Sequence, residues 1–239
     1  MQYTSVKYKQ IIAAGDYITD CRVLIMDSNG TEQTVNQSEL VSVEISEGCF
    51  ETVTVGMAVS AEIELSMLVP SWSPARMARI RPQIRVRNST ATSEWLNKGV
   101  FWLDTRRQTK AFAGDDVLTI HGYDGMLMAE QEFWGVNWTE RKDYLVLQDI
   151  CNNIPSWSLN SETNIYIQTL STNLIPTPYG MTVREVLQSI AAERCGNFVM
   201  DENGELKLIP LTSAPAETYY LITRQGNPIT IGGDRIVLL

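Results

Sequence analysis

The residues that could perform catalysis are few and are scattered along the chain. His121, the single histidine, follows an apolar stretch in VLTIHGYDG, and as a base it would need a nucleophile folded beside it. No GxSxG motif is present. We interpret His121 as a histidine at the end of a strand that hydrogen-bonds the backbone, and we predict no catalytic residue. The candidate nucleophiles are one serine and three cysteines, Ser60, Cys49, Cys151 and Cys195.

Metal and cofactor binding are not indicated by the sequence. One histidine and four cysteines without a CxxC pair make a poor metal site. Gly232 and Gly233 follow a short apolar run, but no GxxxxGK[ST] or GxGxxG pattern surrounds them, so we expect only a turn. We therefore predict no metal site and no cofactor. The cysteines are expected to be free, with a Cys21–Cys49 or Cys151–Cys195 disulfide left open as an alternative.

Paired carboxylates could in principle serve glycoside hydrolysis. The closest pairs are Glu62/Glu64, Asp115/Asp116 and Glu130/Glu132. Residues 59–69 alternate between apolar and polar types, which places Glu62 and Glu64 together on the wet face of a strand. We interpret such pairs as solvated or salt-bridged charges.

A cluster of arginines lies in ARMARIRPQIRVR, within an extended segment in which several of them share one face. Arginine suits phosphate, so one interpretation is a nucleic-acid contact. Another is a subunit interface, where arginine is enriched and pairs with carboxylates such as Glu62 and Glu64 of another strand or chain. A solvated strand face is the third. We favour the interface because the net charge is −9. The candidate interface residues are Arg76, Arg79, Arg81, Arg85 and Arg87.

The tryptophans allow a different class of function. An aromatic platform could bind sugar, although we expect most of these side chains to be core or interface anchors. The six tryptophans are Trp72, Trp95, Trp102, Trp134, Trp138 and Trp157.

Composition restricts the remaining options. The chain has 239 residues, 44% hydrophobic and 20% charged, as expected of one large or two modest globular domains. An acidic chain is a poor general binder of phosphate backbones, which argues against nucleic acid as the main partner. No apolar run approaches the roughly 20 residues that span a bilayer, so we predict no membrane insertion. The N-terminus lacks the features of a signal peptide, and we expect synthesis in the cytoplasm.

The first half of the chain has the pattern of an all-β unit. Several short strands at regular spacing with turn signals between them suggest a barrel or sandwich. Pro82 should confine its strand to an edge or a bulge. The expected strands are 22–27, 40–45, 59–69, 80–86, 99–105 and 117–122.

The second half changes character near Tyr123. Short helices are expected at 124–133 and 143–153, and a strand at 165–168. Thr182 and Glu185 have capping-box spacing, and an apolar helical face follows until Gly196, the expected left-handed residue after the helix. Residues 197–200 and 205–211 should form a hairpin, and 218–222 and 229–239 a final pair of strands. The chain ends on IVLL, which we interpret as a sign that it is part of a longer protein.

The stretch GMTVREVLQSIAAERCGNFVMDENGELKLIPL resembles the hub proteins of bacteriophage tails and related contractile machines. LTIHGYDGMLMAEQEF is similar to the strand-to-helix step of that family, and VGMAVSAEIEL fits its first β-barrel in position and pattern. The resemblance implies a mainly β fold with an α+β insertion: a tail-tube-like β-barrel and a small mixed α/β domain. It divides the chain into a first barrel (1–122), an inserted domain (123–204) and strands that return to the barrel (205–239).

The same resemblance implies a function in assembly. The chain would be the N-terminal portion of a structural hub that forms a ring, as a homotrimer, between the tail tube and the tail tip or baseplate. Its partners would be tail-tube and distal tail or baseplate proteins and a tape-measure protein, with DNA only in passage. The channel-facing residues would be Glu62 and Glu64. Synthesis in the host cytoplasm would precede incorporation into the virion tail. Two alternatives remain open: the anchor region of a tail-tip cell-wall hydrolase, and a carbohydrate-binding module.

Overall fold

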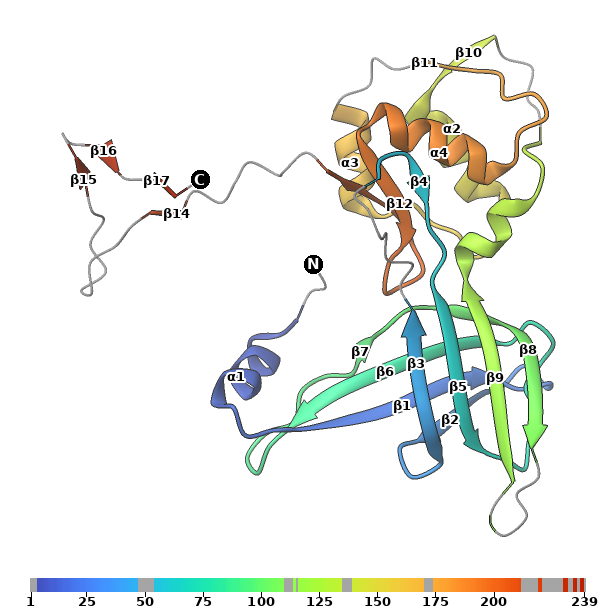
Figure 1. Cartoon of the computed structure of the whole chain (residues 1–239), viewed down its shortest axis with the longest axis vertical. Coiled ribbons are helices and arrows are strands. Elements are labelled where there is room, and N and C mark those ends of the chain that lie inside the picture. The colour runs from blue at the N-terminus through green and yellow to red at the C-terminus, as the bar shows by residue number, and fades with distance from the viewer. Residues whose placement is uncertain are drawn as a thin grey trace.

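The computed structural model describes residues 4–46, 54–109, 114, 116–134, 139–169 and 174–211, together with four two-residue strands beyond them. These residues form a large β-sheet unit and a smaller α/β unit stacked on one end of it (Figure 1). The mainly β fold with an α+β insertion is therefore confirmed. The four short strands are β14 (Tyr219–Tyr220), β15 (Thr230–Ile231), β16 (Asp234–Arg235) and β17 (Val237–Leu238).

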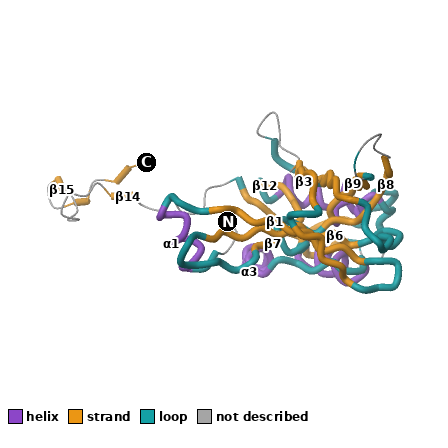
Figure 2. Tube along the Cα trace, turned by 90° about the horizontal axis from the view of Figure 1, so that it is seen from below, coloured by secondary structure: helices purple, strands orange, loops and turns teal. Residues whose placement is uncertain are grey.

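The sheet unit begins with one short helix and continues as eight strands. The helix lies beside the ends of β1 and β6, on the side of the molecule opposite β8 (Figures 1 and 2). The elements are α1 (Val6–Ala14), β1 (Ile18–Met26), β2 (Glu32–Asn36), β3 (Leu40–Ser46), β5 (Glu62–Leu68), β6 (Arg79–Arg87), β7 (Leu96–Asn97), β8 (Phe101–Thr109) and β9 (Val117–Asp124).

Alternation along the strands creates the core of this unit. In β5, Ile63, Leu65 and Met67 are fully buried, whereas Glu62 and Glu64 are exposed, as their period of two predicts. The neighbouring strands contribute side chains of the same kind, so the two halves of the sheet enclose one apolar layer. The other central members include Val23, Ile25, Ile80, Phe101 and Ile120.

The strands follow the order β2-β1-β6-β8-β9-β5-β3, with β7 added to β6. β6 and β8 are joined by only two residue pairs, Arg79 with Trp102 and Ile80 with Phe101. The sheet folds over at this narrow connection, so that β1 and β6 cross behind the upright strands β3, β5, β9 and β8 (Figure 1).

The expected barrel is not closed by a continuous ladder within the described residues. β2 and β3 are consecutive and are joined by a tight turn, in which the Glu39 amide donates to the Asn36 carbonyl at 2.9 Å. They nevertheless stand at opposite ends of the strand order, and each has one ladder partner. The sheet therefore stays split between β2 and β3.

Pro82 does not mark an edge strand, contrary to prediction. β6 pairs with β1 along its whole length and lies inside the sheet. On the other side its ladder partner changes from β8, at residues 79–80, to β7, at residues 83–84. The Pro82 carbonyl points to that side and accepts from the Lys98 amide at 2.9 Å. An N–H at residue 82 would point to the same side, where neither β8 nor β7 pairs with this residue. Its absence in proline therefore breaks no ladder hydrogen bond.

The α/β unit packs helices on one face of a small sheet. β12 pairs with β13 in the predicted hairpin. It also pairs with β4, which lies between β3 and β5 of the sheet unit in the sequence. Its core includes Phe198, Leu147, Ile150 and Ile190, each with 0% exposure. The elements are β4 (Met57–Ala58), η1 (Gly125–Glu130), β10 (Glu140–Lys142), α2 (Asp143–Asn153), α3 (Ser161–Thr169), β11 (Leu174–Pro176), α4 (Val183–Glu193), β12 (Gly196–Met200) and β13 (Leu206–Pro210).

The predicted capping box at the start of α4 is confirmed. The Thr182 hydroxyl accepts from the Glu185 amide at 3.2 Å, and the Glu185 carboxylate accepts from the Thr182 amide at 2.7 Å. The end of the helix differs from prediction, because Cys195 and not Gly196 takes the left-handed conformation, with φ of 49°. Gly196 is required for a different reason: a Cβ there would lie 2.8 Å from the Ile209 carbonyl oxygen across the hairpin.

The strand predicted at 165–168 is wrong, since these residues belong to helix α3. The Asn160 side chain caps the helix by accepting from the amides of Glu162 and Thr163 at 3.1 and 3.4 Å. Ile167 is fully buried in the α/β core. The helix therefore depends on a cap outside the predicted window and on tertiary packing, which outweigh the β preference of its isoleucines.

One carboxylate joins two of the segments that run between the units, the one between β4 and β5 and the one between β9 and η1. Asp124, at the end of β9, accepts from the Ser60 hydroxyl at 2.8 Å and the Ala61 amide at 2.9 Å, both on the crossing strand before β5. It also accepts from the Met126 amide of η1 at 3.0 Å. Burial raises the pKa of Asp124, and these hydrogen bonds and the Arg184 charge oppose that effect only in part.

The chain does not return to the large sheet directly after the insertion. Within the predicted return segment, 205–239, Leu206–Pro210 form β13 and pair with β12 of the α/β unit. The strands predicted at 218–222 and 229–239 fall mostly outside the described residues. In the parts described, β14 pairs with β17 and β15 with β16.

Candidate assembly surfaces

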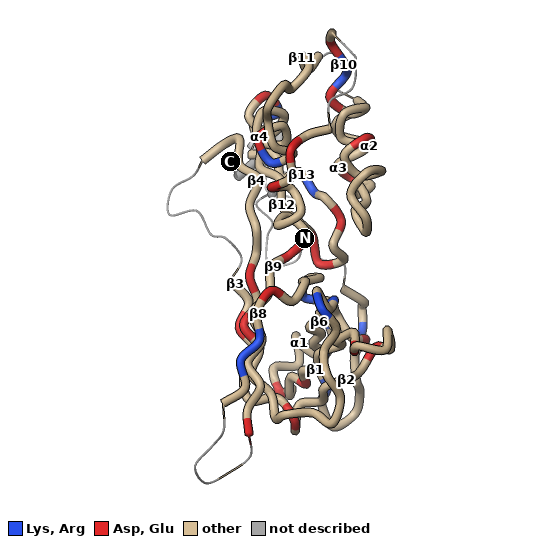
Figure 3. Tube along the Cα trace, turned by 90° about the vertical axis from the view of Figure 1, so that its right-hand side faces the viewer, with Lys and Arg blue, Asp and Glu red and all other residues tan. Residues whose placement is uncertain are grey.

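The predicted arginine cluster lies on the outer face of the β1–β6 pair, except for Arg76, which is exposed in the turn before β6. We call Arg22 of β1 and four arginines of β6 the arginine surface; basic positions gather at β6 in Figure 3. These side chains share one face because they alternate with Ile80, Pro82, Ile84 and Val86. The β6 members are Arg79, Arg81, Arg85 and Arg87.

Two carboxylates of the same chain neutralise part of this surface. Asp20 of β1 lies 2.9 Å from the Arg85 Nε and 3.0 Å from the Arg87 Nε. Glu32 of β2 lies 2.5 Å from Arg81 and 4.0 Å from Arg79. Within the described residues these arginines do not pair with Glu62 or Glu64, and pairing with those carboxylates of another chain stays a prediction. Five guanidinium groups thus face two carboxylates, which leaves an excess of positive charge on a chain whose net charge is −9.

The Trp95 ring contacts two members of the arginine surface. The Arg22 and Arg85 guanidinium carbons lie 4.2 and 4.5 Å from its ring centroid, which is cation–π geometry for both arginines. Burial, followed by the charges of Arg85 and Arg81, lowers the pKa of Arg22. Charge repulsion within the surface is therefore offset in part by an aromatic ring that contacts two of its cations.

The Asp20 carboxylate gives this surface a pH dependence that can be measured. Burial opposes its ionisation, but hydrogen bonds from Arg87 and Arg85 and their charges outweigh burial and hold the pKa of Asp20 below 3.8. The ionised group therefore contributes stability above its unfolded pKa, and that contribution is lost as the pH falls through the folded pKa. Asp20→Asn should cost on the order of 1 kcal/mol at pH 7 and nothing once Asp20 is protonated.

Urea unfolding of the wild type and of Asp20→Asn across the acid range measures this difference. The exposed Asp104, changed to Asn, is the matched control and should follow the wild type at every pH. A gap between wild type and Asp20→Asn that stays constant with pH would contradict the assignment.

The carboxylates predicted to face a channel lie on the outer face of β5, on the opposite side of the strand from the core. Glu44 of β3 stands directly across from Glu64, and Glu62 is next to them; we call these three residues the acidic sheet face. Directly opposed like charges are unfavourable. His121 lies beside them, and its Nε2 is 3.3 Å from Glu62, so the side-chain partner of His121 is a carboxylate and not the backbone as predicted.

The nucleophiles considered in the sequence do not meet His121 in the described part of the chain. The Ser60 hydroxyl is bound to Asp124, and burial raises the pKa of Cys151 to about 12. Cys21, Cys151 and Cys195 are free thiols, and Cys49 lies outside the described residues. Within the described residues, no cluster of three or more His, Cys, Asp or Glu side chains could hold a metal ion. No helix among them is both long and apolar enough to cross a bilayer.

The tryptophans serve as packing residues in the described chain. Trp102 and Trp157 are buried, Trp72 packs against the sheet core, and Trp134 stacks on Phe133 with centroids 5.5 Å apart. Trp95 packs against two arginines. None of these five is an open aromatic platform, and the sixth, Trp138, lies outside the described residues.

The four-stranded half of the sheet has two open edges. Among the described strands, β3 pairs only with β5, and β8 pairs only with β9 beyond the contacts of Phe101–Leu103 with β6 and Ala78. All side chains from residue 104 to 109 are exposed. Exposed edges of this kind present unpaired backbone groups that can accept another strand. Neither edge was predicted from sequence, because an edge is defined only once the strand order is known.

Comparison with known proteins gives a likeness at the level of fold. No protein-family model and no curated protein sequence matches the chain. The tail protein from Neisseria meningitidis MC58 aligns with a TM-score of 0.50 and 13% identity, over 82% of this chain and 53% of that one. A chain of the half-lidded Francisella PdpA-VgrG complex aligns with a TM-score of 0.50 and 8% identity, over 82% and 32%. The chain thus spans about half and about a third of their lengths, and it has the fold of part of a tail protein.

Proposed function

We propose that the chain is a structural protein of a phage or prophage tail and that it assembles as a ring through the edges of the β3-β5-β9-β8 sheet. Its fold is that of part of a tail protein. The observation that carries the proposal is the pair of open edges on that sheet. The ring would be the hub between the tail tube and the tail tip or baseplate, with three copies as the expected number.

The strand directions allow the sheet to continue from one copy to the next. β3, β5, β9 and β8 alternate in direction along the sheet, so β3 and β8 run opposite ways. β3 of one copy would therefore meet β8 of its neighbour as an antiparallel pair, in the same pattern as inside the sheet. The two surfaces differ, so the contact is head to tail, and such contacts close into rings when the rotation permits.

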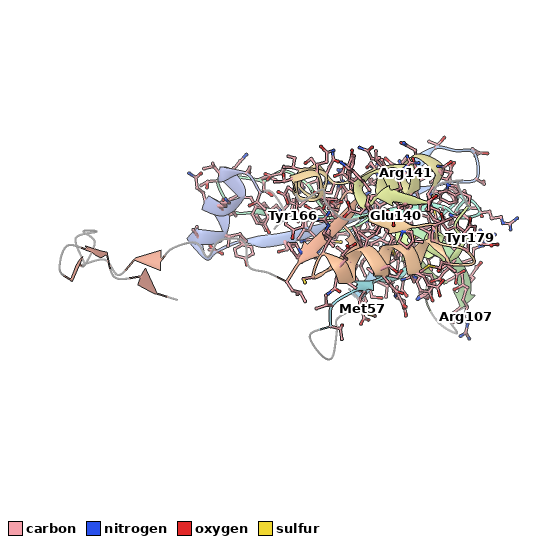
Figure 4. The ribbon with its side chains drawn as sticks, turned by 90° about the horizontal axis from the view of Figure 1, so that it is seen from above. Met57, Arg107, Glu140, Arg141, Tyr166 and Tyr179 are labelled. Atoms are coloured by element: carbon pink, nitrogen blue, oxygen red, sulfur yellow. The ribbon has the colours of Figure 1, made fainter. Side chains whose placement is uncertain are left out.

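The charges at the two edges are complementary. Glu44 of β3 shares a face with Glu64. Arg107 of β8 lies across from Thr119, which is paired with Ser66 on that same face. Arg107 is exposed and lies at the periphery of the molecule (Figure 4). Opposite charges on adjoining strands stabilise their pairing, so Glu44 of one copy and Arg107 of the next would favour the proposed contact.

The acidic sheet face would line the channel of this ring. Glu62, Glu64 and Glu44 would repel the phosphates of DNA, so that DNA and a tape-measure protein pass without tight binding. The arginine surface lies on the crossing half of the sheet, and Arg76, Arg79, Arg81, Arg85 and Arg87 would contact neighbouring tail proteins there. The location implied for the assembled protein is the virion tail.

A charge exchange tests the ring. In solution, multi-angle light scattering of the full chain should give an oligomer, with a trimer expected. Glu44→Lys and Arg107→Glu should each weaken association by about tenfold or more, since a cross-strand charge pair becomes a repulsion. The double variant should recover most of the loss.

Glu140→Lys is the matched control, because Glu140 is exposed on β10 at the far end of the α/β unit (Figures 1 and 4). It should leave the oligomer unchanged. A monomer at every concentration would remove the ring proposal. If neither single variant weakens association, the β3–β8 contact is not the interface of the oligomer.

A further inference from the structure

A small polar recess lies at the junction of the two units. It has a volume of about 100 Å³. Arg79, Arg81 and Asn97 line it from the sheet unit, with Trp102 beside them, and Ser156 and Asn203 line it from the α/β unit. No carboxylate lines the recess among the described residues. Its charged groups are thus two arginines.

Glu32 provides a hydrogen-bond partner for only part of the Arg81 guanidinium group. Its terminal nitrogen reaches both oxygens of Glu32 at 2.5 Å, but its Nε is buried and has no hydrogen-bond partner among the described residues. A buried donor without a partner costs about 1–3 kcal/mol. Such donors are rare in folded proteins and call for a partner such as an ion or water. Arg79, 4.0 Å from Glu32, has a side chain that is 42% exposed.

The opposite wall adds uncharged polar groups. Ser156 has a φ of 70°, a left-handed conformation that a serine seldom adopts and that costs energy. The side-chain oxygen of Asn203 accepts from the side-chain amide of Asn97 at 3.1 Å, and this hydrogen bond joins the two walls beside the recess. The two arginines on one wall therefore face a hydroxyl and an amide on the other.

We propose that this recess binds a single small oxyanion, the group that phosphate and carboxylate ligands share. Arg79 and Arg81 would donate through their guanidinium groups, in the charge-assisted geometry that arginine forms with such groups. The volume admits one oxyanion and not the body of a nucleotide. The bound anion would bridge the sheet unit and the α/β unit, since its ligands come from both.

Isothermal titration of the full chain with inorganic phosphate, and separately with acetate, tests the site. Saturable one-to-one binding in roughly the millimolar range is expected for the preferred oxyanion. The relative affinity of the two probes distinguishes a phosphate site from a carboxylate site. Arg81→Gln should weaken binding at least about tenfold, because it removes one of the two positive charges that line the recess.

A second variant keeps the test independent of the Arg81–Glu32 pair. Asn203→Asp retains the acceptor for Asn97 and places a negative charge on the exposed wall, so it should weaken anion binding to a similar degree. Lys9→Gln on α1 removes one exposed positive charge far from the recess and should change nothing. The proposal is overturned if neither probe gives saturable binding, or if Lys9→Gln weakens binding as much as Arg81→Gln.

Discussion

Replacement of Arg194 by Met should destabilise the protein by about 3–5 kcal/mol. The Arg194 side chain is 4% exposed, and that of its partner, Asp143, is 0% exposed. The Arg194 Nε donates to Asp143 Oδ2 at 2.7 Å, and a terminal nitrogen contacts the same oxygen. Without the guanidinium, the carboxylate would remain buried without a countercharge, which costs far more than the loss of a surface ion pair.

The position of the pair explains why the whole α/β unit should respond. Asp143 opens α2, and its other oxygen accepts from the Tyr144 amide at 2.7 Å. Arg194 caps the end of α4. The pair therefore joins the start of one core helix to the end of another. Urea unfolding followed by circular dichroism measures the loss.

An exposed ion pair supplies the control for Arg194→Met. Glu162 is 77% exposed in its pair with Lys207, and Glu162→Gln should cost at most about 0.5 kcal/mol. The double variant Asp143→Asn/Arg194→Met should recover part of the loss, because it removes both charges. Equal effects of Arg194→Met and Glu162→Gln would show that the buried pair has no special weight.

Asp124→Ala should cost about 2–4 kcal/mol and loosen the junction between the units. The substitution leaves the Ser60 hydroxyl and the Ala61 and Met126 amides without their acceptor in a largely buried place. Arg184, through the Ala58 and Met126 carbonyls, and the backbone hydrogen bond from the residue 124 amide to the Ala61 carbonyl would then remain between the segment before β5 and the start of η1. Limited proteolysis should therefore detect new cleavage near residues 58–61 or 124–126, and urea unfolding should give the stability loss.

Ser60→Ala provides a graded comparison for the junction. It removes one of the three hydrogen bonds to Asp124 and should cost only about 1 kcal/mol. Both variants should retain the helices of the α/β unit, because most of its core, including Leu147, Ile150 and Ile190, comes from residues outside the junction. If Asp124→Ala unfolds no more easily than Ser60→Ala, the Asp124 carboxylate does not stabilise the junction between the two units.

Elements with complete local signals could be predicted from the sequence. The alternation of β5 defined its buried face, and Thr182 with Glu185 defined the start of α4, because both patterns lie within a few residues. Helix α2 was predicted at 143–153, the bounds it has. The likeness to tail proteins stated from sequence is confirmed at the level of fold.

Features that depend on distant segments could not be predicted. The partners of the arginines, Asp20 and Glu32, are set by the pairing of β1 with β2 and β6. Helix α3 needs Asn160 and the burial of Ile167, neither of which appears in a pattern of isoleucines. The recess at the junction combines side chains of both units, so no motif marks it. The sequence shows that these arginines lie close together, but it does not show that Asp20 and Glu32 of the same chain neutralise part of their charge.

The separation of β2 from β3 has a consequence for how the protein folds. The three residues that join them favour the simplest local event, a hairpin between neighbouring strands, yet the native structure gives β2 and β3 different partners. β2 pairs with β1, and β3 pairs with β5, which in turn pairs with β9, whose residues lie 49 to 61 positions further along the chain than their β5 partners. Pairings at such sequence separation form slowly, since loop closure must precede the contacts that reward it. A premature β2–β3 hairpin is therefore the natural competitor on the folding pathway, and the sheet reaches its final order only after that hairpin has been avoided or undone.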